Sequence, residues 1–303
     1  MNRLVRYYRG VRDWVQGREA IDHQLELTGA VLADRVRSRT EVGSLQDVEF
    51  RVYSQFGDDG IIQWLLGRLP GLTPRFVEFG VEDYSEANTR FLLVHDRWSG
   101  LVMDGDPGNI QVLRNRRWFW KHDLTAEAAF LTCENVDQVV GAWVGDKGLG
   151  LLHIDVDGND YWLWQALECV APDIVVVEYN GTFGAEQAIT TPYSPDFRRL
   201  QAHYSGQYAG ASLAALAHLG RQKGYALLGT NGAGNNAYFL RRDLLGPGLV
   251  EREVADVYSP PVFRDSRTPE GRLDYKPLQA RRALLKGMPV WNVRTGQVEA
   301  FEP

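Results

Sequence analysis

Carboxylates gather where apolar segments of this chain end. His153-Ile154-Asp155-Val156-Asp157 closes an apolar run that begins at Leu149, and Glu178 closes the run from Ile174 to Val177. Asp155, Asp157 and Asp160 put three carboxylates at the end of one buried strand, where they repel one another unless they are hydrogen-bonded or bind a cation or a substrate. We therefore predict a functional site there. The candidate general bases are Asp155, Asp157, Glu178 and His153.

A strand, a turn, a helix and a second strand are predicted over residues 76–104. The runs Phe76 to Gly80 and Gly100 to Asp104 are apolar, as in a parallel sheet, and they end at a glycine and a carboxylate. Ser85 to Asn88 offers a helix start between them. In such sheets ligands bind outside the carboxyl ends of the strands. Gly80 would admit a ligand to the backbone, and Asp104 could accept hydrogen bonds from a ribose diol.

The turn after the first of these strands disfavours one class of ligand. A dinucleotide site uses a second and a third glycine around its pyrophosphate, whereas Gly80 is followed by Val81, Glu82 and Asp83. Two acids beside a pyrophosphate would repel it. The turn therefore suits a positively charged nucleoside without phosphate, which describes S-adenosylmethionine better than NAD. A turn without any ligand is the alternative.

Strands and helices continue to alternate along the chain. We predict a third strand over residues 118–124, and Asp123 at its end would accept the exocyclic amine of an adenine or cap the next helix. Strands over 149–154 and 173–178 follow, and an antiparallel hairpin over 225–241 closes the sheet. The predicted fold class is α/β: a doubly wound, mostly parallel seven-stranded sheet that ends in an antiparallel hairpin and carries an N-terminal helical extension.

The chain is expected to have three parts. Residues 1–48 form the helical extension, 49–245 the sheet domain, and 246–303 a tail packed on that domain. The first helix is basic and amphipathic, and peripheral contact with a membrane, with the sheet domain or with a second subunit in a homodimer would each explain it. Residues 181–207 lack periodicity, which is typical of a lid.

Residues 53–60 precede the first strand and allow two interpretations. Asp58 or Asp59 could cap the helix that starts near Ile61. Gln55 and Asp58 could instead lie over the ligand site. The sequence leaves both open.

The composition restricts the partners. A net charge of -6 over 303 residues gives no reason to expect nucleic acid. No apolar run approaches the roughly 18 residues of a membrane span. Cys133 and Cys169 lack metal-ligand spacing, and we expect both to be reduced thiols of a cytoplasmic protein.

The order of the marked strand ends resembles that of the class I S-adenosylmethionine-dependent methyltransferases, which have a Rossmann-like fold. Four segments look more narrowly like the FkbM-type O-methyltransferases, and the resemblance covers about residues 50–243. These segments are Ser54-Gln55, Glu78-Phe79-Gly80, residues 104–109 and Ile154-Asp155-Val156-Asp157-Gly158.

The resemblance implies a role for each candidate cofactor residue. Glu78 and Gly80 would border the methionine part of S-adenosylmethionine, with Gln55 over the site. Asp104 would bind the ribose, and Asp123 would bind the adenine. Asp155 would face the transferred methyl group.

A metal ion is a further implication. Some related O-methyltransferases hold Mg²⁺ between carboxylates at the ends of the fourth and fifth strands. The ligands here would be Asp155, Asp157, Glu178 and Asn180. Alternatively, Asp157 and Asp160 cap the following helix, and Glu178 pairs with an arginine.

These observations lead to one expected function and two rivals. We expect S-adenosylmethionine-dependent O-methylation of a hydroxyl on a small-molecule or glycan acceptor, such as a sugar, a glycan precursor or a natural product. A metal-dependent glycosyltransferase would instead use Asp155-Val156-Asp157 to hold a metal and a nucleotide diphosphate. A non-catalytic scaffold that keeps the methyltransferase fold is the other alternative.

Overall fold

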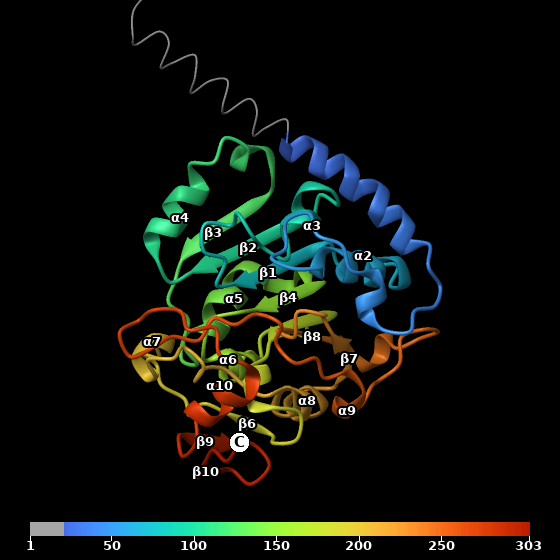
Figure 1. Cartoon of the computed structure of the whole chain (residues 1–303). Coiled ribbons are helices and arrows are strands. Elements are labelled where there is room, and N and C mark those ends of the chain that lie inside the picture. Colours follow the sequence, from blue (N-terminus) through green and yellow to red (C-terminus); the bar gives the residue numbers. More distant parts are fainter. Residues whose placement is uncertain (1–20) are drawn as a thin grey trace, which may run out of the picture.

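The computed structural model describes residues 21–303, so the basic helix predicted at the start of the chain lies outside it. A seven-stranded sheet forms the centre, in the order β3-β2-β1-β4-β5-β8-β7 (Figure 1). Neighbouring strands from β3 to β5 are parallel, and β8 is antiparallel to both β5 and β7. The predicted fold class is confirmed. The strands are β1 Arg75–Phe79, β2 Ser99–Asp104, β3 Leu124–Ala128, β4 Leu151–Ile154, β5 Ile174–Glu178, β7 Tyr225–Thr230 and β8 Asn236–Arg241.

Helices cover both faces of the sheet because the side chains of the parallel strands are apolar on both sides. One face packs against three helices, α2 Asp58–Arg68, α3 Arg90–Val94 and α4 Pro107–Arg114. The other face packs against α5 Val136–Val144, α6 Asp160–Ala166 and α8 Leu213–Gln222. A helical segment over residues 21–37 lies outside α3, where Ala33 contacts Phe91 (Figure 1). Within residues 21–303, no helix is both long and apolar enough to cross a membrane.

The third strand begins later than predicted. Trp118 precedes a short 3₁₀ turn, Phe119–Lys121, and β3 starts only at Leu124. The strand signal is the alternation of buried Leu124 and Ala126 with more exposed neighbours, which is the pattern of an edge strand. The tryptophan-rich run before it packs beside the sheet instead of pairing with it. Asp123 therefore lies at the amino edge of β3, and the prediction that it ends a strand is wrong.

The C-terminal residues form a second, smaller sheet with the middle of the chain. Strands β9 Pro289–Asn292 and β10 Gln297–Ala300 pair with each other, and β9 pairs with β6 Ile189–Thr190. Its apolar residues make a separate small core around Phe183, Ile189 and Phe301. Two short helices precede this sheet, α9 Val254–Val257 and α10 Leu278–Leu284. The connection after β5, which carries β6 and α7 Arg199–Ala202, is therefore anchored by the C-terminal residues.

The turn after β1 explains the glycine at its tip. Gly80 has φ +72°, and a Cβ on it would lie 1.6 Å from the carbonyl oxygen of Asp155. The backbones that leave β1 and β4 thus meet at van der Waals distance with no room for a side chain. Residue 80 must be glycine to place Asp155 at the sheet edge, which is a structural reason distinct from ligand access.

We expect Gly80→Ala to destabilise the fold by roughly 3 kcal/mol or more, because the new Cβ meets fixed backbone. Gly71→Ala is the matched control, since Gly71 also has positive φ (+94°) but nothing within 4 Å of its Cβ position. It should cost only about 1–2 kcal/mol of backbone strain. Urea unfolding of both variants measures the difference, and equal losses would contradict the close approach to Asp155.

Candidate active site

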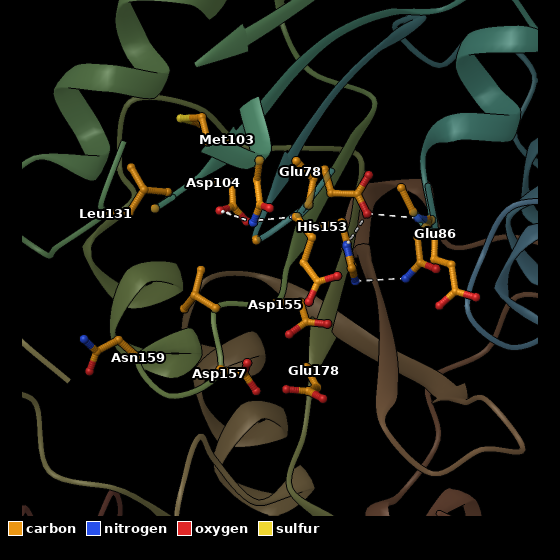
Figure 2. A pocket seen from close by; sticks show the side chains of 18 of the residues that line it. Glu78, Glu86, Met103, Asp104, Leu131, His153, Asp155, Asp157, Asn159 and Glu178 are labelled. Carbon is orange, nitrogen blue, oxygen red and sulfur yellow. Dashed lines mark hydrogen bonds and ion pairs between the residues drawn. The ribbon is translucent and has the colours of Figure 1, made fainter. Parts of the chain in front are cut away.

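One cavity of about 530 Å³ opens at the carboxyl edge of the sheet, where β1, β2, β4 and β5 end (Figure 2). Eight of the predicted site residues line it: Gln55, Glu78, Gly80, Asp104, His153, Asp155, Asp157 and Glu178. Asp123 and Asn180 are not among its lining residues. Two further acids, Glu82 and Glu86, complete an acidic wall, and among residues 21–303 Arg199 is the one arginine of the lining.

The carboxylate of Asp104 is fixed at the tip of β2. Its Oδ2 accepts a hydrogen bond from the backbone N–H of Glu82 (2.8 Å), which lies on the loop after β1. Its Oδ1 accepts from the N–H of Asp106 (2.8 Å) and from Nδ2 of Asn109 (3.1 Å). Oδ2 retains a lone pair, because a carboxylate oxygen accepts two hydrogen bonds. Asp104 can therefore accept a hydrogen bond from a ligand without reorganising.

Glu78 and His153 form a buried pair beneath the cavity. Glu78 Oε1 accepts from the N–H of Asn88 (2.9 Å) and from His153 Nδ1 (2.8 Å), and Oε2 accepts from the backbone and hydroxyl of Thr89. The other ring nitrogen of His153 contacts Asn88 Nδ2 at 2.9 Å. The hydrogen bonds from His153 and Thr89 hold the pKa of Glu78 below its usual value despite burial. Both nitrogens of His153 are thus engaged by the protein, which leaves it without a free atom for a substrate proton.

Three carboxylates converge at the far end of the cavity. One side-chain oxygen each of Asp155, Asp157 and Glu178 lies within 4.8 Å of the others. Figure 2 shows these three pointing toward one another from the ends of β4 and β5. Three charged carboxylates this close repel one another, which favours a protonated carboxyl in the cluster. Burial and the nearby acids raise the pKa of Asp155 to about 7, and burial raises the pKa of Glu178 well above its usual value.

Arg199 balances the exposed side of this cluster. Its Nη1 donates to Asp157 Oδ1 (2.7 Å), and its Nη2 donates to Asp265 Oδ2 (2.7 Å). Asp157 itself has a left-handed backbone with φ +57°. The arginine on α7 therefore joins the tip of β4 to the C-terminal residues, and sequence reasoning did not identify it because it lies in the non-periodic connection.

Asn180 and Asp160 serve the neighbouring loops. Asn180 Oδ1 accepts from the N–H of Thr182 (2.9 Å), and its Nδ2 donates to the carbonyls of Gln207 (2.8 Å) and Ala209 (2.9 Å). It braces the connection after β5 and does not join the three carboxylates. Asp160 accepts from the N–H groups of Val156 (2.7 Å) and Gly158 (3.0 Å), so it fixes the turn that presents Asp155 and Asp157.

The two acids before α2 are structural. Asp59 Oδ2 accepts from three successive backbone N–H groups, Val52 to Ser54, at 2.7–2.8 Å, and so shapes the loop that carries Gln55. Asp58 accepts from Asn231 and Asn236 and from the hydroxyl of Tyr238. Neither lines the cavity, whereas Gln55 does.

Asp123 lies on the opposite edge of the sheet, where it accepts from the hydroxyl of Ser99 at 2.6 Å. The true end of β3 instead brings Ala129, Phe130 and Leu131 to the cavity beside Met103. These apolar side chains suit a flat aromatic ring. Correct placement of β3 from its alternating pattern could have found them.

The site can thus hold a polar group at Asp104, a flat ring against an apolar wall and a hydroxyl at the three carboxylates. A carboxylate with a pKa near 7 is well suited to general base catalysis at neutral pH. The absence of phosphate-binding glycines and the acidic wall favour a cationic ligand.

Comparison with known proteins gave structural matches only. No family model matches the chain, and no curated protein matches it. The N-terminal domain of EvdMO1 with SAH bound is 13% identical and has a TM-score of 0.38 over 74% of this chain and 94% of that chain. A putative O-methyltransferase from Klebsiella pneumoniae is 17% identical, with a TM-score of 0.37 over 69% of this chain and 88% of that chain. The CurJ carbon methyltransferase is 14% identical, with a TM-score of 0.38 over 77% and 70%.

One of these neighbours is described with SAH bound, and the other two are described as methyltransferases. Their identities and TM-scores are too low to assign an activity to this chain.

The carboxylate cluster should make stability depend on pH. A carboxyl whose pKa is raised on folding stabilises the folded state below its unfolded pKa, and this stabilisation is lost as pH rises through the folded pKa. For Asp155 that interval runs from its ordinary value of 3.8 to about 7. We expect wild-type protein to lose more stability between pH 5 and pH 8 than Glu178→Gln, in which the amide removes one charge.

Urea unfolding across this pH range measures the effect. Glu302→Gln is the control, because Glu302 is a surface carboxylate (68% exposed side chain) far along the chain from the cluster. Parallel pH profiles for wild type and Glu178→Gln would show that the cluster is not protonated in the folded state.

Proposed function

We propose that the protein is an S-adenosylmethionine-dependent O-methyltransferase that acts on a hydroxyl of a sugar, a glycan precursor or a natural-product small molecule. One observation carries the proposal: the fixed carboxylate of Asp104 and the carboxylates of Asp155 and Glu178 line the same cavity. The first suits a ribose, and the others suit an acceptor hydroxyl. The Gln55, Glu78-Gly80 and Asp155-Gly158 segments, which carry the narrower FkbM-type resemblance, all reach this cavity.

The residues present fit the cofactor. Asp104 would accept from the ribose hydroxyls, and Met103, Phe130 and Leu131 would enclose the adenine. The acidic wall near Gly80 suits a sulfonium and an amino group, because it places negative charge beside two positive ones. Bound S-adenosylmethionine supplies the methyl group.

The acceptor oxygen and its proton are the task of the carboxylate cluster. The oxygen must lie in line with the bond that breaks, and its proton must leave as the new O–CH₃ bond forms. Asp155 would take this proton, since its pKa of about 7 is raised by burial and by neighbouring acids. Glu178 and Asp157 would hold the acceptor hydroxyls beside it. Arg199 limits the repulsion within the cluster through its pair with Asp157.

The three carboxylates also match the ligand chemistry of Mg²⁺, which prefers oxygen donors. We propose that they take the cation once they are deprotonated, with Asp155, Asp157 and Glu178 as ligands. A cation there would bind two oxygens of a diol and lower the pKa of one. Asn180 is not included, because its side chain already braces the connection after β5.

Binding of S-adenosylhomocysteine tests the cofactor assignment. We expect isothermal titration to give micromolar-scale affinity and Asp104→Asn to weaken it at least about tenfold, the loss expected for hydrogen bonds to a charged group. Asp123→Asn is the matched control, since Asp123 lies on the opposite edge of the sheet and should leave the affinity unchanged. Folded wild-type protein that gives no heat would refute the proposal.

Titration with Mg²⁺ tests the metal assignment. Carboxylates must lose their protons to bind a metal, so Mg²⁺ should raise the thermal midpoint more at pH 8 than at pH 6. Glu178→Gln should abolish that pH-dependent increment, while Glu302→Gln should retain it. A Mg²⁺ effect of equal size at both pH values, or one that survives in Glu178→Gln, would count against the site.

A further inference from the structure

A second chamber of about 750 Å³ opens directly beside the active-site cavity. The two share Asp157, Phe130, Phe197 and Arg199, so Asp157 at the carboxylate cluster borders both. The other walls come from the turn after β2, from α7, and from Asp265 and Arg267 of the C-terminal residues. Figure 1 shows α7 beside this C-terminal segment, in agreement with the ion pair between Arg199 and Asp265.

Two arginines that line this chamber, Arg198 and Arg267, contact the protein mainly through a ring or a carbonyl group. Arg198 lies over the ring of Phe130 at 4.0 Å from its centroid and donates to the carbonyl of Phe197 at 3.1 Å. Arg267 donates to the carbonyl of Gly271 at 3.0 Å. Within residues 21–303, neither guanidinium forms an ion pair with a carboxylate. Each has five N–H groups, so most donors remain open.

The acids of the same chamber are already engaged. Asp106 Oδ1 accepts from the N–H of Gly108 at 2.7 Å, where it caps α4. Asp157 and Asp265 share Arg199, each at 2.7 Å. The three arginines and three aspartates of the outer chamber balance in charge, but within residues 21–303 Arg198 and Arg267 have no carboxylate partner, whereas the wall of the inner cavity is acidic. A molecule that spans both could place a hydroxyl at its inner end and a negative group against these two arginines.

Phosphate is the negative group that best matches this arrangement. A guanidinium binds phosphate oxygens through two parallel N–H groups, and two such forks serve a phosphate or a diphosphate. The guanidinium of Arg198 is planar by resonance, and its cation–π contact with Phe130 helps to hold it at the chamber wall. A chamber of this volume holds a drug-sized ligand, which is far more than a carboxylate requires.

We propose that the methyl acceptor is a phosphate-bearing sugar, as a sugar phosphate or a nucleotide sugar, whose phosphoryl group is bound by Arg198 and Arg267 while its hydroxyl lies at the carboxylate cluster. This inference rests on the proposed methyltransferase function, because it takes that cluster as the acceptor site. The outer chamber thereby selects the acceptor through its two arginines without carboxylate partners among residues 21–303, and the inner cavity selects the reacting hydroxyl.

Isothermal titration of the full chain in the presence of S-adenosylhomocysteine tests the proposal, with UDP-glucose, glucose 1-phosphate, pyrophosphate and glucose as ligands. We expect the three phosphate-bearing ligands to bind and glucose not to bind. The double variant Arg198→Gln/Arg267→Gln should weaken that binding at least about tenfold, which is the loss expected for charged hydrogen bonds. Added NaCl should weaken it as well.

The matched control is Arg272→Gln, which removes an exposed arginine from the same C-terminal segment without touching the chamber. It should bind the phosphate-bearing ligands like wild type, and all variants should bind S-adenosylhomocysteine equally. Equal binding of phosphate-bearing ligands by wild type and the double variant, or none at millimolar concentration, would overturn the inference while the cofactor result stands.

The rival glycosyltransferase gives a different pattern. UDP-glucose would then bind only with Mn²⁺, would depend on Asp155 and Asp157, and would be indifferent to Arg198 and Arg267. S-adenosylhomocysteine would not bind at all. That outcome would overturn both the inference and the proposed function, and the S-adenosylhomocysteine titration distinguishes the two failures.

Discussion

The buried carboxylate of Glu78 is the interaction on which the site depends. It joins β1 to β4 through His153 and joins both strands to the loop before α3 through Asn88 and Thr89. A charge with almost no exposure to water is tolerated only when several donors surround it. Because the carboxylate lies on β1 and its donors lie on β4 and on the loop before α3, the tips of β1 and β4 have one relative position, and Gly80 and Asp155 meet there without a side chain between them.

Other acids of the cavity are stabilised by different partners. These partners determine whether each carboxylate can accept a hydrogen bond, is paired with a cation or has a raised pKa. Asp104 is neutralised by fixed backbone N–H groups, so it stays an acceptor for a neutral donor. Asp157 is paired with Arg199, so its charge is balanced. Asp155 and Glu178 lie beside each other and beside Asp157, and burial together with the neighbouring acids raises the pKa of both. A protonated carboxyl is therefore favoured at this end of the cavity, where Arg199 pairs only with Asp157.

The sequence was sufficient to predict those cavity residues that directly follow a buried strand. Gly80, Asp104, Asp155 and Glu178 follow mostly apolar runs, and the structure brings these strand ends together as a parallel sheet must. Asp123 was misplaced because a run of tryptophan and phenylalanine reads as a strand from hydrophobicity alone. The backbone of this run forms a 3₁₀ turn in which Trp120 is exposed, while the true strand is marked only by the alternation of buried Leu124 and Ala126 with more exposed residues.

The acceptor end lay beyond sequence reasoning for a different physical reason. Arg198, Arg199 and Phe197 belong to a connection without periodicity, and Asp265 and Arg267 come from a segment some 65 residues further along the chain. They meet because the C-terminal residues contact that connection directly, as between Gln207 and Asp265, and pair with it in the small β6–β9–β10 sheet. The proposed cofactor end is thus built by the large sheet, whose pattern is local in the sequence. The proposed acceptor end is built by long-range packing around one arginine that bridges Asp157 and Asp265. A chain with the same strand tips but another C-terminal segment would keep the cofactor end and present a different acceptor chamber.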